Sequence, residues 1–320
     1  MKIDIVYLWV DGSDATWIAK KNQYLPQGEK SLDPEIAGDC RFVDRDELKY
    51  SLRSLERYAP WINHIYIVTD SQRPKWLKES VPNVTIVDHR EIIPSQYLPL
   101  FNSSVIELFI HKIEGLSEHF LYANDDMLFG REVAPSFFFH QDGEPIVRQV
   151  KRKIKRRKGA YQRQIYHMQM LICERYSHYF RLAPHHNIDA YRRSDYEQAM
   201  AEFATEVEQS LGSRFRQDGD MQRAIVSYRL LATSSKKLVR VGRYNGAAGL
   251  VDRLVRFFMR RYITDSRCFP ICLDHLEEKI KRYNPALYTI NDESRATPEQ
   301  RQAAMELLER LLPEKSSFEI

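Results

Sequence analysis

The chain has 320 residues, 43% of them hydrophobic and 29% charged, which excludes a disordered, collagen-like or low-complexity protein. Its net charge of +4 is uneven, because residues 145–173 hold nine Lys or Arg and no acidic residue, leaving −5 on the rest. Four scattered cysteines exclude a disulfide framework, and no apolar stretch approaches the roughly 18–20 residues that span a bilayer. With no signal-peptide pattern at the N-terminus, we expect a cytoplasmic protein.

Over the first 130 residues, predicted strands alternate with predicted helices. Runs of β-branched and aromatic residues indicate strands, and helical spacing of Leu or Ile indicates helices. The strands are expected at 3–10, 64–70, 83–88 and 119–123, and the helices at 44–58, 73–78 and 103–113. This alternation predicts an α/β fold with a doubly wound, mostly parallel sheet, in which ligands bind beyond the carboxyl ends of the strands.

Acidic residues follow two of the predicted strands. Asp125 and Asp126 follow the fourth strand, and because adjacent carboxylates repel one another, a cation such as Mg²⁺ is the simplest relief. The alternative is a turn in which Asn124 and the aspartates cap the backbone. The loop Trp9–Asp14 after the first strand could hold a nucleotide or be an ordinary glycine turn, and it is neither a Walker loop nor a dinucleotide motif.

From about residue 145 the sequence becomes basic, aromatic and helical, with no alternating series of strands. Helices are expected at 194–211, 221–233, 249–262 and 297–312, the last with an N-cap at Thr297. The expected organisation is an α/β core at 1–144, a basic insertion at 145–183 and a helical region at 184–320 that completes the site.

Seven of the eight residues 151–158 are Lys or Arg. Such a run could bind nucleic acid, anionic lipid or an anionic polymer, or it could be a solvated insertion. The predicted helix at 249–262 could lie on a membrane surface, although packing into the core is the commoner outcome. Cys268 and Cys272 lack a second Cys or His pair, which excludes a structural zinc site.

Three further places could supply a base, an acid and an anion clamp. They are Glu107 on a predicted helix, His185 after Pro184, and the charged segment 214–220. For each of them a purely structural role is the alternative, since a single Glu on a helix is usually solvated and a single His is usually structural.

Several segments resemble the conserved blocks of the Stealth phosphotransferases. Asp4-Ile-Val-Tyr-Leu-Trp-Val-Asp-Gly-Ser-Asp14 resembles the first block. Segments of the second block are matched at 41–61, 65–70, 98–107 and 115–126, and the third and fourth blocks more loosely at 184–222 and 269–275. The resemblance implies a glycosyltransferase-A type fold and transfer of a sugar 1-phosphate from a UDP-sugar to a glycan hydroxyl, in capsule or exopolysaccharide synthesis, with UMP as leaving group.

The resemblance also implies roles for individual residues. The catalytic set is Glu107, Asp126, His185 and Arg216, the nucleotide contacts are Trp9, Asp11, Gly12, Asp14 and Arg53, and the ligands of Mg²⁺ or Mn²⁺ are Asp125, Asp126 and Asp274. Arg216 would neutralise the β-phosphate, and either Glu107 or His185 would take the proton of the acceptor hydroxyl. The family commonly has Asn-Asp where this chain has Asp274-His275.

Two other functions compete with this expectation. A metal-dependent glycosyltransferase would use the same donor but release UDP. A nucleic-acid-binding protein would rest on residues 151–158 alone and leave the acidic strand ends unexplained, so no nucleic-acid partner is expected. The expected partners are a nucleotide sugar and a glycan or lipid-linked oligosaccharide acceptor, with a peripheral contact to the inner face of the cell membrane.

Overall fold

The computed structural model describes residues 1–25, 42–153, 159–180, 182–212, 214–234, 239–241 and 265–320, with only the backbone at 150–153 and 239–241. Its central sheet has the strand order β3-β2-β1-β4-β8. The strands are β1 (Ile3–Leu8), β2 (Ile65–Thr69), β3 (Val84–Asp88), β4 (His119–Asn124) and β8 (Asp189–Arg192). All pairs are parallel except β4 with β8. The predicted α/β fold with a mostly parallel sheet is therefore confirmed.

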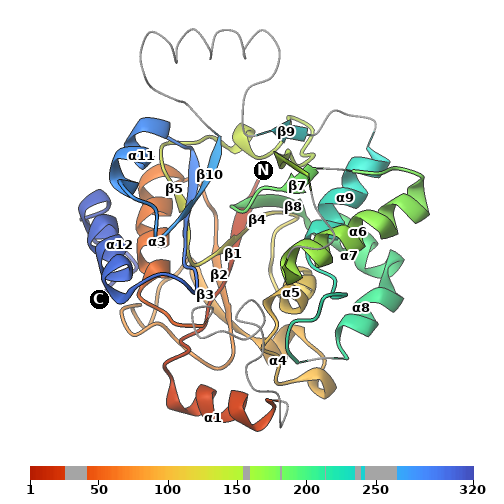
Figure 1. Ribbon diagram of the computed structural model, residues 1–320, viewed down its shortest axis with the longest axis horizontal. Coiled ribbons are helices and arrows are strands. Elements are labelled where there is room, and N and C mark those ends of the chain that lie inside the picture. The colour runs from red at the N-terminus through yellow and green to blue at the C-terminus, as the bar shows by residue number, and fades with distance from the viewer. Residues whose placement is uncertain (26–41, 154–158, 181, 213, 235–238, 242–264) are drawn as a thin grey trace, which may run out of the picture.

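Both faces of the central sheet are covered, as its near-continuous apolar strands require. Val6 and Tyr122 pack into one hydrophobic core, and Ile5 and Tyr7 into another on the opposite face. The first core holds α5 (Ser103–Ile106), the 3₁₀ helix η3 (Glu107–Lys112), α6 (Ala160–Tyr176), α7 (Arg193–Glu202) and α9 (Ala224–Thr233). The second holds α3 (Glu47–Tyr58) and β5 (Met127–Phe129). Figure 1 shows these two groups of elements on either side of the sheet.

Two smaller sheets complete the fold. One has the order β10-β11-β5, with β10 (Ser266–Pro270) parallel to β11 (Leu287–Asn291) and β11 antiparallel to β5. The other has the order β7-β6-β9, formed by β7 (Leu182–Pro184), β6 (Val147–Lys153) and β9 (Val239–Val241). The sequence after residue 145 shows no strand series, yet this region supplies strands to all three sheets. Its strands are only three to seven residues long and carry polar residues, so no period stands out.

The remaining helices are short connections, apart from one long helix near the C-terminus. They are α1 (Ala15–Gln23), α4 (His89–Ile92), η2 (Ser95–Tyr97), η4 (Pro135–Phe137), α8 (Ala204–Ser210), α11 (Leu276–Tyr283) and α12 (Pro298–Leu311). The predicted capping box of α12 is confirmed, because the Thr297 hydroxyl accepts from the Gln300 N–H and the Gln300 side chain accepts from the Thr297 N–H. None of the described helices combines the length and the apolar character needed to cross a bilayer.

Three of the helix predictions differ from the structure or fall outside it. A helix at 73–78 is wrong, since this segment is a turn in which Leu77 pairs with Glu319 of the C-terminal tail, and Trp76 accepts from the Ile320 N–H. The expected helix at 194–211 is divided into α7 and α8 at the fully buried Phe203. The expected helix at 249–262 lies outside the described residues.

Candidate active site

The loops that follow β1 and β4 leave the same edge of the central sheet. The two strands are parallel neighbours, and Leu8 at the end of β1 is in register with Asn124 at the end of β4. The loop Trp9–Asp14 and the pair Asp125 and Asp126 therefore lie side by side, as the topology predicts for carboxyl ends of adjacent parallel strands.

The Trp9–Asp14 loop is held tightly by the rest of the chain. The Gly12 N–H donates to the Phe42 carbonyl at 2.6 Å, and a Cβ at residue 12 would lie 2.2 Å from that oxygen, so only glycine fits. Asp14 caps α1 by accepting from the Trp17 N–H at 2.7 Å, and Asp11 accepts from the Ser13 N–H at 2.9 Å. These two aspartates thus organise the loop, which leaves their contact with a nucleotide a prediction.

Four carboxyl groups gather where the N-terminal end of α3 meets the β4–β5 turn, and we call them the acidic cluster: Asp44, Glu47, Asp125 and Asp126. Burial and then the charges of Asp126, Glu47 and Asp44 raise the pKa of Asp125 well above its usual range. Burial and the charge of Glu47 raise the pKa of Asp126 to about 7. Burial also raises the pKa of Asp44 to about 6 and that of Glu47 to about 6. Arg45, whose Nη1 lies 3.7 Å from Glu47 Oε1, compensates only part of this negative charge.

The acidic cluster suits a hard divalent cation. Asp126 Oδ1 is buried and accepts no hydrogen bond, which leaves a free carboxylate oxygen in a site already crowded with negative charge. Within the described part of the chain, no three His, Cys, Asp or Glu side chains form a ready-made metal site. Mg²⁺ commonly takes one or two carboxylates and completes its shell with water and substrate phosphates, and Asp125 and Asp126 are the residues that would hold it.

Glu107 belongs to a buried polar network on the α9 side of β4. Its Oε1 accepts from the Tyr122 hydroxyl at 2.9 Å, and that hydroxyl lies 2.7 Å from Asn124 Oδ1, directly before Asp125. Arg223 Nε lies 3.5 Å from Glu107 Oε2. Burial raises the pKa of Glu107, although Arg223 opposes this shift. The network therefore reaches from the start of η3 to the residue that precedes the acidic cluster.

His185 is joined to the same network through Asp189. His185 Nε2 lies 2.7 Å from Asp189 Oδ1, and Asp189 Oδ2 accepts from Arg223. The other ring nitrogen, Nδ1, lies 2.9 Å from the Ser266 hydroxyl at the start of β10. The structure thus connects the two candidate bases, Glu107 and His185, through one arginine and one aspartate.

Arg216 approaches this network from the loop before α9. Its guanidinium donates to the Ser103 hydroxyl at 3.0 Å. Burial lowers the pKa of Arg216, while the charges of Glu107 and Asp220 oppose that shift. Asp220 is in turn fixed by the Asn102 side chain at 2.6 Å. Glu107, His185 and Arg216, predicted separately from the sequence, are therefore neighbours in the fold.

Two predicted site residues do not join this assembly. Arg53 is buried against the C-terminal segment, where Glu319 accepts from its Nε and Nη2 at 2.8 Å each, and Glu309 and the Leu312 carbonyl accept from Nη1. Its donors are thus engaged in holding α3 to the end of the chain rather than in contacting a nucleotide. Asp274 is exposed in the turn before α11 and makes no group of three metal-ligating side chains with Asp125 and Asp126.

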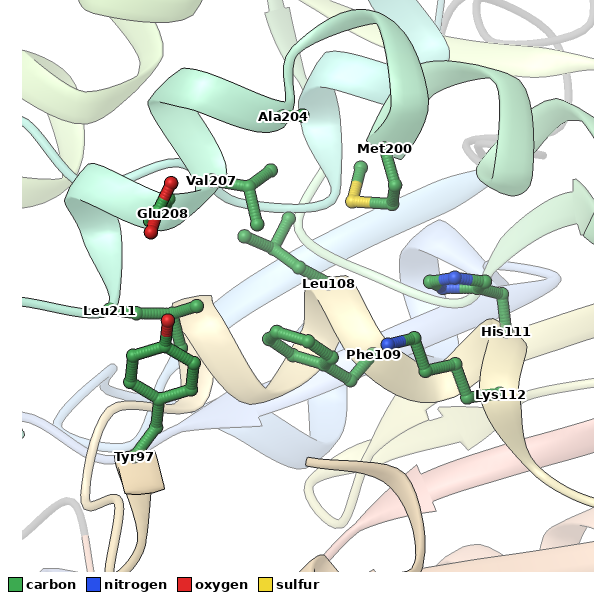
Figure 2. A pocket seen from close by; sticks show the side chains of 10 residues that line it. All are labelled: Tyr97, Leu108, Phe109, His111, Lys112, Met200, Ala204, Val207, Glu208 and Leu211. Atoms are coloured by element: carbon green, nitrogen blue, oxygen red, sulfur yellow. The ribbon is translucent and has the colours of Figure 1, made fainter. Parts of the chain in front are cut away.

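A cavity of about 630 Å³ borders the acidic cluster at Asp44. Its other lining residues come from the start of α3 and from α12, namely Arg45, Asp46, Tyr50, Pro298, Arg301, Gln302 and Met305. A second pocket of about 230 Å³ lies elsewhere, and Figure 2 shows Leu108 and Phe109 of η3 facing Met200 and Val207 of α7 and α8. None of the residues predicted for the site lines either pocket, and the first pocket reaches the acidic cluster only at Asp44.

Four residues of the site were not singled out as functional by the sequence. From the sequence, Asp44 and Glu47 are explained as acidic residues at the N-terminal end of a helix, where they interact favourably with the helix dipole. Asp189 is the first residue of β8, a four-residue strand with a charged residue at each end, so the sequence gives no signal for it. Arg223 directly follows the matched segment that ends at Gln222 and begins an apolar helix, so a buried ion pair could have been suspected.

Comparison with known families matches the N-terminal part of the chain. Residues 1–29 match Stealth protein CR1, conserved region 1, and residues 41–147 match Stealth protein CR2, conserved region 2. The predicted resemblance is thereby confirmed for the first two blocks, and the looser resemblance at 184–222 and 269–275 stays a prediction.

Curated relatives match over the same part. The capsular polysaccharide phosphotransferase LcbA of Neisseria meningitidis is 50% identical over 147 residues, which cover 44% of this chain and 39% of that protein. An exopolysaccharide phosphotransferase of Streptomyces coelicolor is 51% identical over 142 residues, covering 44% of this chain and 24% of the relative. A capsular polysaccharide phosphotransferase of Actinobacillus pleuropneumoniae is 47% identical over 142 residues, with 44% and 39% covered. The matches thus span about a quarter to two fifths of these relatives.

Solved structures of similar shape include glycosyltransferases. The galactosyltransferase LgtC aligns over 98% of both chains at 11% identity with a TM-score of 0.47. The glycosyltransferase GlyE of Streptococcus pneumoniae aligns over 98% of this chain and 63% of its own at 10% identity with a TM-score of 0.41. A likeness at this level carries no argument about chemistry.

Proposed function

We propose that this chain, which carries conserved regions 1 and 2 of the Stealth proteins, transfers a sugar 1-phosphate from a UDP-sugar to a hydroxyl of a glycan acceptor. The product is a phosphodiester of a capsule or exopolysaccharide, and the leaving group is UMP. Three relatives that are about 50% identical over 44% of the chain are named capsular or exopolysaccharide phosphotransferases, which supports this reaction class.

The observation that carries the proposal is the juxtaposition of opposite charges at one edge of the sheet. The acidic cluster follows β4, and the buried Glu107–Arg223 pair is joined to it through Tyr122 and Asn124. Phosphoryl transfer depends mainly on positioning and on neutralising charge that spreads over the phosphate oxygens. Such a reaction needs carboxylates to bind a cation and guanidinium groups to neutralise phosphate oxygens, and both lie at this edge of the sheet.

Asp125 and Asp126 are the residues that would hold Mg²⁺ or Mn²⁺. The ion would supply positive charge at the oxygens of the diphosphate. The positive charge would also offset the burial and the repulsion that raise the pKa values of Asp125 and Asp126. We expect Asp126→Ala to fold normally and to lose nearly all turnover.

Arg216 is the residue proposed to neutralise the transferred phosphate. Its planar, permanently charged guanidinium can make two parallel hydrogen bonds to phosphate oxygens. The Ser103 hydroxyl orients one end of the group, and burial away from water strengthens its attraction for an anion. The acceptor hydroxyl must lose a proton during the attack, and Glu107 and His185 are the two candidates to take it.

Chromatography of the released nucleotide tests the proposal. The purified protein is incubated with Mg²⁺ and UDP-glucose, UDP-galactose or UDP-N-acetylglucosamine, with a glycan acceptor. Release of UMP, dependent on the acceptor and absent with Asp126→Ala, is the expected result. Release of UDP would show the alternative glycosyltransferase reaction, in which the acceptor attacks the anomeric carbon.

The basic run at 151–158 is proposed to contact an anionic membrane or the growing phosphate-containing glycan. Its side chains lie outside the described residues, so this proposal rests on the sequence alone. Replacing its Lys and Arg residues by neutral ones should weaken sedimentation with vesicles of anionic lipid or with the polymer at low salt. Unchanged sedimentation would contradict the proposal.

A further inference from the structure

His185 is closed off from any acceptor hydroxyl. The residue is only 3% exposed, and both of its ring nitrogens have partners. Nε2 lies 2.7 Å from Asp189 Oδ1 and Nδ1 lies 2.9 Å from Ser266 Oγ. An acceptor sugar cannot reach the ring without breaking one of these contacts, so His185 can serve as a base only through a neighbour.

The surroundings of Asp189 determine which nitrogen of His185 carries the proton. Burial favours the neutral acid, but the Arg223 guanidinium donates to Asp189 Oδ2, and the pKa of Asp189 is lowered. An ionised carboxylate only accepts hydrogen bonds, so Nε2 must donate to it. A neutral imidazole has a single N–H, and therefore Nδ1 keeps its lone pair and the Ser266 hydroxyl donates to it.

Ser266 lies on the side of His185 that leads to the acidic cluster. It is half-buried, whereas His185 is fully enclosed. Side chains two residues apart on a strand share a face and are about 7 Å apart, so Ser266 and Cys268 of β10 point the same way. Cys268 is in register with Thr289 of β11, and Thr289 is in register with Met127 of β5, the residue that follows Asp126. The face of β10 thus leads from His185 toward the carboxylates.

We propose that Ser266 is a catalytic residue of this site, which relays the proton of the acceptor hydroxyl to His185. The proposal rests on the proposed function and deepens it, because it chooses His185 rather than Glu107 as the terminal base. Asp189 is the positioning residue, since it fixes the tautomer and then faces the imidazolium that forms. Arg223, shared between Asp189 and Glu107, holds the aspartate in place.

In this step the acceptor oxygen forms a bond to the β-phosphorus of the donor. The acceptor proton passes to Ser266 Oγ while the Ser266 proton passes to His185 Nδ1, so the serine is unchanged and His185 becomes positively charged. The bond between the β-phosphorus and the bridging oxygen breaks, and its electron pair leaves on UMP. No oxidant, reductant or further reactant is required.

Nitrogen-15 NMR of histidine-labelled protein tests the hydrogen-bond arrangement without any substrate. The His185 signals are assigned by their loss in His185→Gln. We expect the proton of the neutral ring on Nε2, and a shift of the Nδ1 signal in Ser266→Ala. A proton on Nδ1, or a doubly protonated ring at pH 8, would overturn the relay, because Ser266 could then only accept.

Kinetics test the role of the relay in transfer. Ser266→Ala should lower kcat at least about 100-fold, and Ser266→Thr, which keeps a hydroxyl, should stay within about tenfold of wild type. If Ser266 and His185 act as one unit, the double variant Ser266→Ala with His185→Gln should lower kcat no further than the more damaging single variant does. Ser194→Ala, which removes a serine hydroxyl that donates to Glu118 before the start of β4, is the matched control and should keep full activity.

The outcomes separate the relay from the reaction itself. Wild-type turnover in Ser266→Ala, or multiplicative losses in the double variant, would refute the relay while leaving phosphate transfer established. If Ser266→Ala folds poorly, the comparison of Ser266→Thr with wild type and the NMR of the wild-type protein still decide. No transfer by wild type with any donor would count against the proposed function, and the tautomer of His185 would then decide the relay alone.

Discussion

Replacing Asp126 by Asn should stabilise the metal-free protein, and more so as the pH rises. Asp126 is half-buried beside Glu47 with its Oδ1 enclosed, and desolvation together with the charge of Glu47 raises its pKa from 3.8 to about 7. Asn has nearly the same shape but no charge to bury. The substitution therefore removes a charge that destabilises the folded protein. A carboxylate at this position is explained by a binding function and not by stability.

The sign and size of the effect follow from proton linkage. The unfolded chain releases this proton near pH 3.8, whereas the folded protein keeps it until about pH 7. Between these values the folded state binds more protons, so wild-type stability falls by about 1.4 kcal/mol per pH unit and is lowest above pH 7. From pH 5 to pH 8 the advantage of Asp126→Asn over wild type should therefore grow by about 3 kcal/mol, an upper figure.

The assay is urea denaturation of both proteins in EDTA at pH 5 and pH 8. Asp274→Asn, which neutralises an exposed acid, is the control, and it should differ little from wild type in stability because exposed substitutions usually have small effects. Adding 10 mM Mg²⁺ at pH 8 should stabilise wild type but not Asp126→Asn, as ligand linkage requires. An advantage of Asp126→Asn that is the same at both pH values would refute the burial of charge at this position, and equal stabilisation of both proteins by Mg²⁺ would refute the cation site.

Further predictions concern the parts that support the site. Glu107→Gln should lower kcat by about 10²-fold or more without changing the Tm by more than a few degrees, because the charge that faces Arg223 and Arg216 is lost while the shape is kept; unchanged kcat would contradict this. Gly12→Ala should raise the KM for the donor and lower the free energy of unfolding by about 1–3 kcal/mol, since its Cβ would lie 2.2 Å from the Phe42 carbonyl oxygen. A variant as stable as wild type would show that the loop can move to accept the methyl group. Glu319→Ala should lower the free energy of unfolding by about 3–5 kcal/mol, because the buried Arg53 loses its bidentate carboxylate partner. The kcat per folded molecule should be unchanged. A selective loss of donor binding would instead indicate that Arg53 contacts the nucleotide.

The central sheet and the acidic edge could be predicted because their signals are local. The run Ile3–Leu8 is apolar enough to be buried on both faces, and its end is marked by Asp11 and Gly12. The helix at 47–58 has strong Leu periodicity and ends near Pro60. For these elements propensity, patterning and turn residues agree, which is the condition under which sequence reasoning succeeds.

The later strands and the buried network could not be predicted in the same way. β7 and β9 are three residues long, too short to show the two-residue alternation of a strand. β8 is a strand because it pairs with β4 at the edge of the central sheet. The segment 73–78 has helical spacing but pairs with the chain's last residues, a contact about 240 positions away in sequence. Long-range pairing of this kind decides local structure without leaving a local pattern.

The site itself was predicted residue by residue but not as an arrangement. Glu107, His185 and Arg216 were identified, yet the residue that connects Glu107 and His185, Arg223, was not. Arg53 lies within a matched segment, yet its guanidinium anchors the C-terminal tail, and its contact with a nucleotide stays a prediction. Spacing in sequence does not distinguish a buried structural arginine from a catalytic one, whereas the partners of its guanidinium do.

The most direct test of sugar 1-phosphate transfer is to measure which product contains the β-phosphorus of the donor. A UDP-sugar labelled with ³²P at the β position is incubated with the protein, Mg²⁺ and a glycan acceptor, and the products are separated into glycan and nucleotide. Sugar-phosphate transfer predicts that the label moves into the glycan and that the nucleotide product is unlabelled. Label that remains in the nucleotide while the glycan gains only sugar would contradict the account.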